Sequence, residues 1–294
     1  MKVMDKGARK LSDVVCHLGE GPTYDAATNT LFWFDILGRK LVEFPFPDGP
    51  ARVHDLPFMA SALFTLGDGS HLVFAEDGFH LRDPVTGALT LHTPVEADRP
   101  GNRSNDARAH PSGSVWAGTM GKGAESRAGA IYWFRKGEVR RLFPEITIPN
   151  SICFSPDGET GYFADTRRNL LFKVDCDPES GLPVGEVEIF LDHKGMAGGI
   201  DGSVVDADGV LWNARWGSGR VDAYAPDGTH LRSVAVPARQ TSCPAFVGPT
   251  LDRLAVTTAW EGMDDAARTA DPQAGATFML DIEVRGRAEP HALL

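Results

Sequence analysis

Residues 198–212 read GGIDGSVVDADGVLW and contain two Asp-Gly pairs in different settings. Asp208-Gly209 separates two apolar runs, which is where a tight hairpin places residues that tolerate positive φ. Asp201-Gly202 precedes the first run, so it begins a strand and joins no two strands. A turn therefore explains the second pair, and Asp201 needs another explanation.

The same layout returns along the whole chain. Six short apolar runs follow polar turns, and they begin at Leu31, Leu72, Val115, Gly161, Leu211 and Leu254. Successive starts lie 41 to 50 residues apart, and further short strand-like segments follow the runs. A period in the forties with four short strands per unit is typical of a β-propeller blade. We predict an all-β fold, one domain over residues 1–294, built as a six-bladed β-propeller with four antiparallel strands per blade.

The two ends of the chain predict how the ring closes. Residues 13–18 (DVVCHL) resemble the segments that end other repeats, but they come before the first inner strand. The sixth repeat lacks such a segment and ends near Ile282, and residues 284–294 show no clear pattern. We therefore expect residues 13–18 to supply the outer strand of the last blade, because this N-terminal strand would remove an open sheet edge.

One polar residue lies 10 to 12 positions before each apolar run. The six residues are Glu20, Ser61, Asn105, Asn150, Asp201 and Ser242. The inner strands of a propeller surround a central channel, so these side chains should converge on one axis. Two carboxylates and two carboxamides at that place offer the oxygen ligands that hard divalent cations prefer.

Composition narrows the class of partner. A net charge of −11 and a pI near 5.3 disfavour nucleic acid and anionic membranes as partners. The four cysteines form no C-x-x-C pair and are predicted to be reduced thiols. The chain shows no apolar leader and no 18-residue apolar run, so we expect a cytoplasmic monomer or small homo-oligomer that binds no membrane.

Several other motifs limit the chemistry. The nine histidines include no H-x-H or H-E-x-x-H pattern, and no G-x-S-x-G elbow occurs, which argues against a zinc hydrolase and a serine triad. Residues 121–129 (GKGAESRAG) lack the order of a phosphate-binding loop and are predicted to form a lid.

Arg103 shares a strand face with Asn105, where it could neutralise channel carboxylates or donate to a hydroxylated or carboxylated ligand. Glu76 could line the channel rim or belong to a turn.

A family resemblance covers nearly the whole chain. The segments that carry it, in order, are residues 18–22 (LGEGP), 103–106 (RSND), 116–120 (WAGTM), 149–150 (PN), 201–202 (DG) with 211–212 (LW), and 272–275 (PQAG). With these segments the chain resembles the sugar lactonase family, which includes gluconolactonase, regucalcin (senescence marker protein) and luciferin-regenerating enzyme. It is most similar to the bacterial aldonolactonases.

The resemblance implies a six-bladed propeller with one divalent cation, which could be calcium, magnesium, manganese, zinc or iron. It assigns the metal ligands to Glu20, Asn150 and Asp201, and substrate contacts to Arg103, Asn105 and, within the lid, Glu125. It also makes Asp201 the catalytic base. Four residues depart from the family pattern: Ser151 stands where Gly is usual, Ile200 where Pro is usual, and Ala107 and His110 where Gly and Asp are common. None of these departures removes a ligand.

The predicted reaction is the metal-dependent hydrolysis of a sugar lactone to its aldonic acid. Two alternatives stay open at this point. The same metal and carboxylates could hydrolyse phosphotriesters or other esters, which a broad, apolar channel mouth would favour. A non-catalytic metal-binding or protein-interaction propeller is the third, although a scaffold has no need of converging carboxylates.

Overall fold

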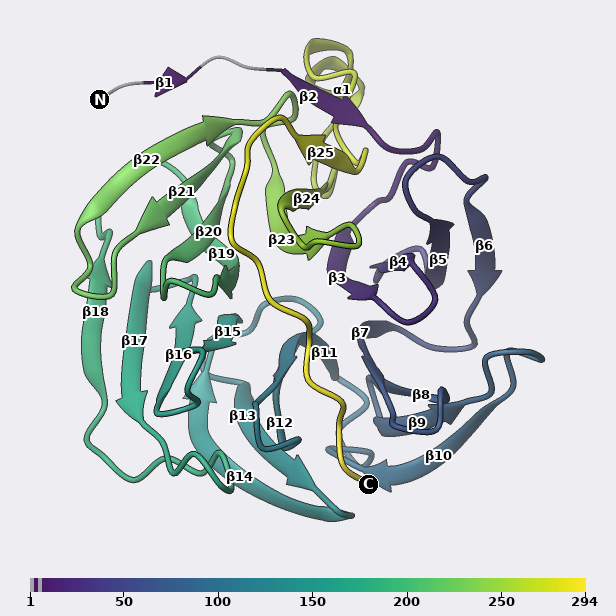
Figure 1. Ribbon diagram of the computed structural model, residues 1–294, viewed down its shortest axis with the longest axis vertical. Helices are drawn as coiled ribbons and strands as arrows, with labels where there is room; N and C mark the ends of the chain where they lie inside the picture. Colours follow the sequence, from purple (N-terminus) through teal and green to yellow (C-terminus); the bar gives the residue numbers. More distant parts are fainter. Residues whose placement is uncertain (1–2, 5–6) are drawn as a thin grey trace.

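Six antiparallel sheets surround a central axis, and each sheet is built from strands that are neighbours in the chain (Figure 1). The computed structural model describes residues 3–4 and 7–294. A short strand, β1 (Val3–Met4), adds to one sheet in parallel orientation beside its outer strand. The predicted six-bladed propeller with four antiparallel strands per blade is confirmed.

Each blade runs from an inner strand at the axis to an outer strand at the rim. The inner strands are β3 (Gly19–Asp25), β7 (Ala60–Thr65), β11 (Asn102–Ala109), β15 (Pro149–Phe154), β19 (Gly199–Val205) and β23 (Thr241–Val247). The second strands are β4 (Thr30–Asp35), β8 (His71–Ala75), β12 (Val115–Gly121), β16 (Thr160–Asp165), β20 (Leu211–Trp216) and β24 (Arg253–Thr258). The third strands are β5 (Lys40–Pro45), β9 (Gly78–Arg82), β13 (Gly129–Arg135), β17 (Leu170–Asp175), β21 (Arg220–Tyr224) and β25 (Phe278–Leu280). The outer strands are β6 (Arg52–Asp55), β10 (Leu89–Pro94), β14 (Glu138–Ile146), β18 (Glu188–Asp192), β22 (His230–Ala235) and, for the last blade, β2 (Ala8–Lys10).

The turns between first and second strands repeat one device. In four blades a glycine with φ between 77° and 83° donates its N–H to the carbonyl three residues earlier; these glycines are Gly69, Gly113, Gly158 and Gly209. Only glycine adopts this backbone conformation without steric cost. The interpretation of Asp208-Gly209 as a hairpin turn is therefore confirmed.

The hydrophobic core lies between neighbouring blades. Six clusters of buried apolar side chains each combine residues of two adjacent blades. In one of them, Trp116 and Ile131 of the third blade pack against Ile152 and Phe163 of the fourth. Because every blade buries both of its faces in this way, its strands are apolar on both sides and the inner strands are held rigidly around the channel.

The N-terminus closes the ring, but through other residues than predicted. The outer strand of the last blade is β2, which pairs with β25 in antiparallel register from Ala8↔Leu280 to Lys10↔Phe278. The prediction for residues 13–18 is wrong, because this segment carries the chain from the outer edge inward to the first inner strand. That path crosses about three strand spacings, roughly 14 Å, so residues 13–18 are needed for the crossing and cannot also pair as the outer strand. Along it the Cys16 amide donates to Gly275, and Leu18 forms a bridge with Ala259.

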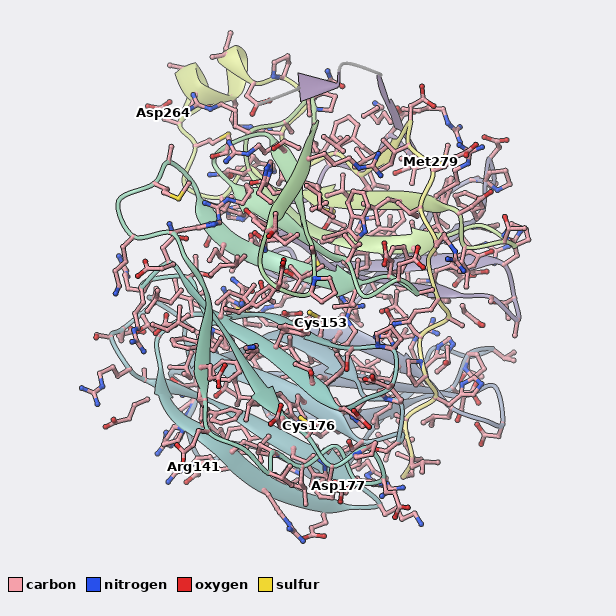
Figure 2. The ribbon with its side chains drawn as sticks, turned by 60° about the vertical axis from the view of Figure 1, so that its left-hand side comes forward. Arg141, Cys153, Cys176, Asp177, Asp264 and Met279 are labelled. Carbon is pink, nitrogen blue, oxygen red and sulfur yellow. The ribbon has the colours of Figure 1, made fainter. Side chains whose placement is uncertain are left out.

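The C-terminal segment, residues 281–294, crosses one face of the ring without forming a strand (Figure 1). Its backbone is bonded to turns of several blades, including Thr65 and Gly113, and Glu289 forms an ion pair of 2.8 Å with the buried Arg108. In Figure 2 this segment lies on the side of the molecule opposite to Asp264 and the helix that follows it, α1 (Asp265–Ala270). Within the described ranges, no helix has the length and apolar character to cross a membrane.

Candidate active site

All six inner strands lose their regular pairing at the same level. Each ladder shifts register at one place, namely between Glu20 and Thr23, Ala60 and Ala62, Ser104 and Ala107, Asn150 and Cys153, Ile200 and Ser203, and Thr241 and Pro244. Such bulges change the direction in which side chains point and are frequent next to active sites. The six polar residues found by repeat alignment lie at or inside these bulges.

Five of the predicted site residues line one cavity of about 340 Å³; they are Glu20, Arg103, Asn105, Asn150 and Asp201. All five are buried. They come from the first, third, fourth and fifth blades, so the convergence depends on closure of the ring. Hollows of about 420 and 470 Å³ lie elsewhere, between outer parts of the blades, but neither receives a pair of inner-strand carboxylates.

Burial and neighbouring carboxylates disfavour the charged forms of Glu20 and Asp201. Burial, followed by the charge of Asp106, raises the pKa of Glu20 to about 8. Burial and then the charge of Glu20 raise the pKa of Asp201 well above its ordinary value. No ion pair joins either group to a basic side chain in the part of the chain that the structure describes, and the Glu20 carboxylate accepts a hydrogen bond of 3.1 Å from the Gly21 amide. Glu20 and Asp201 therefore lack a positively charged partner among the described residues.

Arg103 lies beside these carboxylates without contacting them. Its Nη1 donates to the carbonyl of Ser104 (2.9 Å) and to Oδ1 of Asn105 (2.7 Å). Burial lowers the pKa of Arg103, although the charges of Glu261, Glu20 and Asp201 oppose this effect. Its Nε has no hydrogen-bond partner within the described residues. The guanidinium therefore has one buried N–H without a partner, and other atoms of Arg103 line the cavity.

The donor set of this cavity fits a hard divalent cation. Glu20 and Asp201 supply carboxylate oxygens and Asn150 supplies a carboxamide oxygen, which are the ligand types that such cations prefer. A cation would also neutralise these two carboxylates, whose pKa values are raised by burial and by neighbouring carboxylates. No cluster of three or more His, Cys, Asp and Glu side chains is present in the described ranges, so the site holds two acidic ligands at most.

The sequence of the chain matches a known family over most of its length. The model of the SMP-30/gluconolactonase/LRE-like region matches residues 18–260. The chain belongs to this family. It is 51% identical to a Rhizobium meliloti protein provisionally named sugar lactone lactonase, over 96% of both chains. It is 37% identical to the L-arabinolactonase of Azospirillum brasilense, over 96% of this chain and 94% of the relative.

A solved structure from the same family shows the same fold throughout. The calcium-binding regucalcin of Agrobacterium tumefaciens strain C58 is 54% identical to this chain, covers 100% of both chains and superposes with a TM-score of 0.98. The resemblance predicted from the sequence is thus confirmed.

The structure explains one departure from the pattern of the SMP-30/gluconolactonase family. Ser151 follows Asn150 in the bulge and has a φ of 55°, a conformation that favours glycine. Its hydroxyl donates to the carbonyl of Asp201 at 2.5 Å and accepts from Ser203 at 2.9 Å. Serine adopts this conformation less easily than glycine, but its hydroxyl gains a hydrogen bond to the next blade. This bond holds the backbone of Asp201.

The predicted lid contributes its backbone and one lysine to the cavity. Lys122, Gly123 and Ala124 line it, and the Lys122 ammonium forms an ion pair with Glu76 at 2.5 Å. Glu76 itself does not line the cavity; it holds the lysine that does, and its Oε1 also accepts a hydrogen bond from the Met59 amide, so both alternatives for this residue stay open. Glu125 is exposed, does not line the cavity and accepts a hydrogen bond from the amide of Gly123. Its contact with substrate stays a prediction.

Sequence reasoning missed several residues of the site. Thr166, Trp216 and Glu261 line the cavity, and each lies at or just after the end of a second strand. The signal that could have found them is this shared position, because the loops after the second strands open to the same end of the channel. Asp106 was also missed; its Oδ2 accepts a hydrogen bond of 2.7 Å from Ile152, which ties the third blade to the bulge of the fourth.

Proposed function

We propose that this protein is a sugar lactonase, which hydrolyses a five- or six-membered aldonolactone to the open-chain aldonic acid. The observation that carries the proposal is the convergence of five polar side chains on one cavity; they are Glu20, Asn150, Asp201, Arg103 and Asn105. Membership of the SMP-30/gluconolactonase family and the lactonase names of two relatives support it.

Substrate binding falls to the donors of the third blade and the rim. Arg103 and Lys122 both line the cavity, so both can donate to the hydroxyl and carbonyl oxygens of a sugar lactone. A cavity of about 340 Å³ is within the size range of small-molecule sites. These polar groups favour a hydroxylated substrate over the apolar esters that a hydrophobic mouth would select.

Glu20, Asn150 and Asp201 would hold one divalent cation through their oxygens. A bound cation supplies Lewis acidity, which polarises the lactone carbonyl and stabilises the negative charge that develops on its oxygen. The proposed ligands leave room on the cavity side, because all three line the same space from different blades.

Asp201 acts as the general base. In its ionised form it takes a proton from water while the water oxygen bonds to the carbonyl carbon. The ring C–O bond then breaks, and the ring oxygen receives the proton and becomes a hydroxyl group. General-base catalysis of this kind contributes roughly 10²–10⁴-fold in rate.

A screen of aldonolactones with a pH indicator tests the proposal. Pentono- and hexonolactones, an aryl ester and a phosphotriester are each assayed after EDTA treatment and after addition of Ca²⁺, Mg²⁺, Mn²⁺ or Zn²⁺. We expect metal-dependent hydrolysis of lactones. Hydrolysis of the phosphotriester without turnover of any lactone would refute the proposal.

Replacement of Asp201 separates its two roles. In Asp201→Asn, at saturating metal, we expect kcat for the preferred lactone to fall by about two to four orders of magnitude, because the carboxamide still offers an oxygen but cannot accept the proton. Asp227→Asn, in an exposed turn, is the matched control and should leave kcat unchanged. A near-wild-type kcat for Asp201→Asn would leave Asp201 as a ligand only.

A further inference from the structure

Thr166 lies at the edge of the cavity, immediately after β16, and has no role in the mechanism described so far. Its hydroxyl accepts a hydrogen bond from Nδ2 of Asn150 at 2.8 Å and donates one to the carbonyl of Ile200 at 2.6 Å. It therefore connects a proposed metal ligand on the fourth blade with the backbone that precedes Asp201 on the fifth.

These two bonds end a chain that crosses three blades in one direction. Arg103 Nη1 donates to Oδ1 of Asn105 at 2.7 Å, and Nδ2 of Asn105 donates to Oδ1 of Asn150 at 2.9 Å. Asn150 then donates to Thr166, and Thr166 donates to Ile200. Every group in this chain donates toward the fifth blade.

The two ends of the chain determine its direction. A guanidinium can only donate and a backbone carbonyl can only accept, so Arg103 and Ile200 admit a single order of donors between them. If the Asn150 carboxamide were rotated by 180°, its NH₂ would face the NH₂ of Asn105. The oxygen of Asn150 must therefore lie on the side of Asn105, and its nitrogen on the side of Thr166.

We propose that Thr166 is a positioning residue that fixes the carboxamide of Asn150 with its oxygen toward the cavity. The proposal rests on the proposed function in one respect, namely that Asn150 Oδ1 is a metal ligand. Without the hydroxyl, the buried Nδ2 of Asn150 loses its acceptor, which weakens the preference for this rotamer. The carboxamide would then present its NH₂ to the cavity for part of the time, where a cation is repelled.

The test compares Thr166→Val, Thr166→Ser and wild type in calorimetric titrations with Ca²⁺ and Mn²⁺, using protein first treated with EDTA. Valine keeps the shape of threonine without the hydroxyl, and serine keeps the hydroxyl. We expect the Kd of the valine variant to rise about 10–100-fold, as for other residues that orient metal ligands, and the serine variant to stay within a few-fold of wild type. Thr166→Ala is measured in the same way if the valine variant does not fold.

Thr23→Val is the matched control. Thr23 is a buried threonine whose hydroxyl donates to a carbonyl of the next blade, Leu63, at 3.1 Å, but it does not line the cavity. Its replacement should lower Tm as Thr166→Val does and leave the metal Kd unchanged.

The outcomes are distinguishable. Equal metal affinities of wild type and Thr166→Val, together with a lowered Tm, would make Thr166 merely structural and overturn this proposal alone. A wild-type protein that binds neither cation would overturn the proposed metal site, and the role of Thr166 with it. The proposal is supported if Thr166→Val binds the metal more weakly than wild type, while Thr166→Ser and Thr23→Val bind it about as tightly as wild type.

Discussion

Glu20→Gln should make the protein more stable when no metal is bound. Burial and the neighbouring Asp106 raise the pKa of Glu20 from 4.5 to about 8. In the unfolded chain this carboxyl loses its proton near pH 4.5, whereas in the folded chain it keeps the proton up to about pH 8. Folding is therefore penalised at neutral pH, since the unfolded state binds fewer protons than the folded state.

The size of the penalty follows from the two pKa values. Between pH 4.5 and pH 7 the folded state loses stability at about 1.4 kcal/mol per pH unit, which gives about 3 kcal/mol at pH 7. Glutamine has the shape of glutamic acid and no charge, so it avoids the penalty, but its NH₂ group needs a partner in the cavity. We expect a gain of about 1–3 kcal/mol, which corresponds to about 2 °C in Tm for each kcal/mol in a chain of this size.

Thermal unfolding in EDTA at several pH values measures this effect. The difference in Tm between Glu20→Gln and wild type should be close to zero at pH 4.5, grow as pH rises and level off above pH 8. Addition of a divalent cation should reverse the order, because binding to the folded state stabilises wild type by RT ln(1 + [M]/Kd) and the variant much less. The exposed Glu138→Gln is the control and should change stability by less than about 0.5 kcal/mol.

One result would refute the reasoning. If Glu20→Gln in EDTA is no more stable than wild type at pH 8, the buried carboxylate does not destabilise the fold. Asp201→Asn gives an independent measurement, because burial and the charge of Glu20 raise the pKa of Asp201 as well. The two variants should shift Tm in the same direction.

Two further predictions concern groups on either side of the channel. Arg103→Ala should raise KM and lower kcat/KM for neutral hydroxylated lactones without abolishing metal binding, as measured by steady-state kinetics and calorimetry, because Arg103 reaches the proposed ligand Asn150 only through Asn105. Glu289→Gln should lower the free energy of unfolding by about 1.5–3 kcal/mol in urea denaturation, since it weakens a charged hydrogen bond to the buried Arg108. Glu283→Gln, exposed in the same C-terminal segment, should have no such effect, and equal losses in both variants would contradict the role of the ion pair.

The repeat pattern was sufficient to predict the blades. The six predicted second strands begin within one residue of their observed starts, for example Leu211 as predicted and Thr160 where Gly161 was expected. This accuracy has a physical cause: each blade buries both faces, so its strands are short, apolar and bounded by polar turns with positive-φ glycines. The ring of polar inner-strand residues followed from the same alignment.

The ring closure, the path of the C-terminal segment and the role of Thr166 depend on contacts between blades. Such contacts leave no repeating pattern in a single sequence. Residues 13–18 resemble an outer strand, and only the distance from rim to axis shows that the outer strand must come earlier, at Ala8–Lys10. The C-terminal segment has no periodicity because it bonds to separate turns and not to a ladder. The role of Thr166 depends on hydrogen-bond directions that are set by Arg103 and Ile200 on two other blades.

The six bulged positions also show how one repeating fold produces an asymmetric site. The ring provides six aligned positions near the channel mouth, but only two of them, Glu20 and Asp201, are acidic, and the charges of Glu20 and Asp106 add to burial in raising the pKa of Asp201. Neutral residues fill the other places and support the ligands instead: Ser242 donates to the carbonyl of Gly19, beside Glu20, and Asn105 donates to Asn150. The repeating fold therefore gives an asymmetric site, because two blades supply the proposed acidic ligands and neighbouring blades hold the ligands in place.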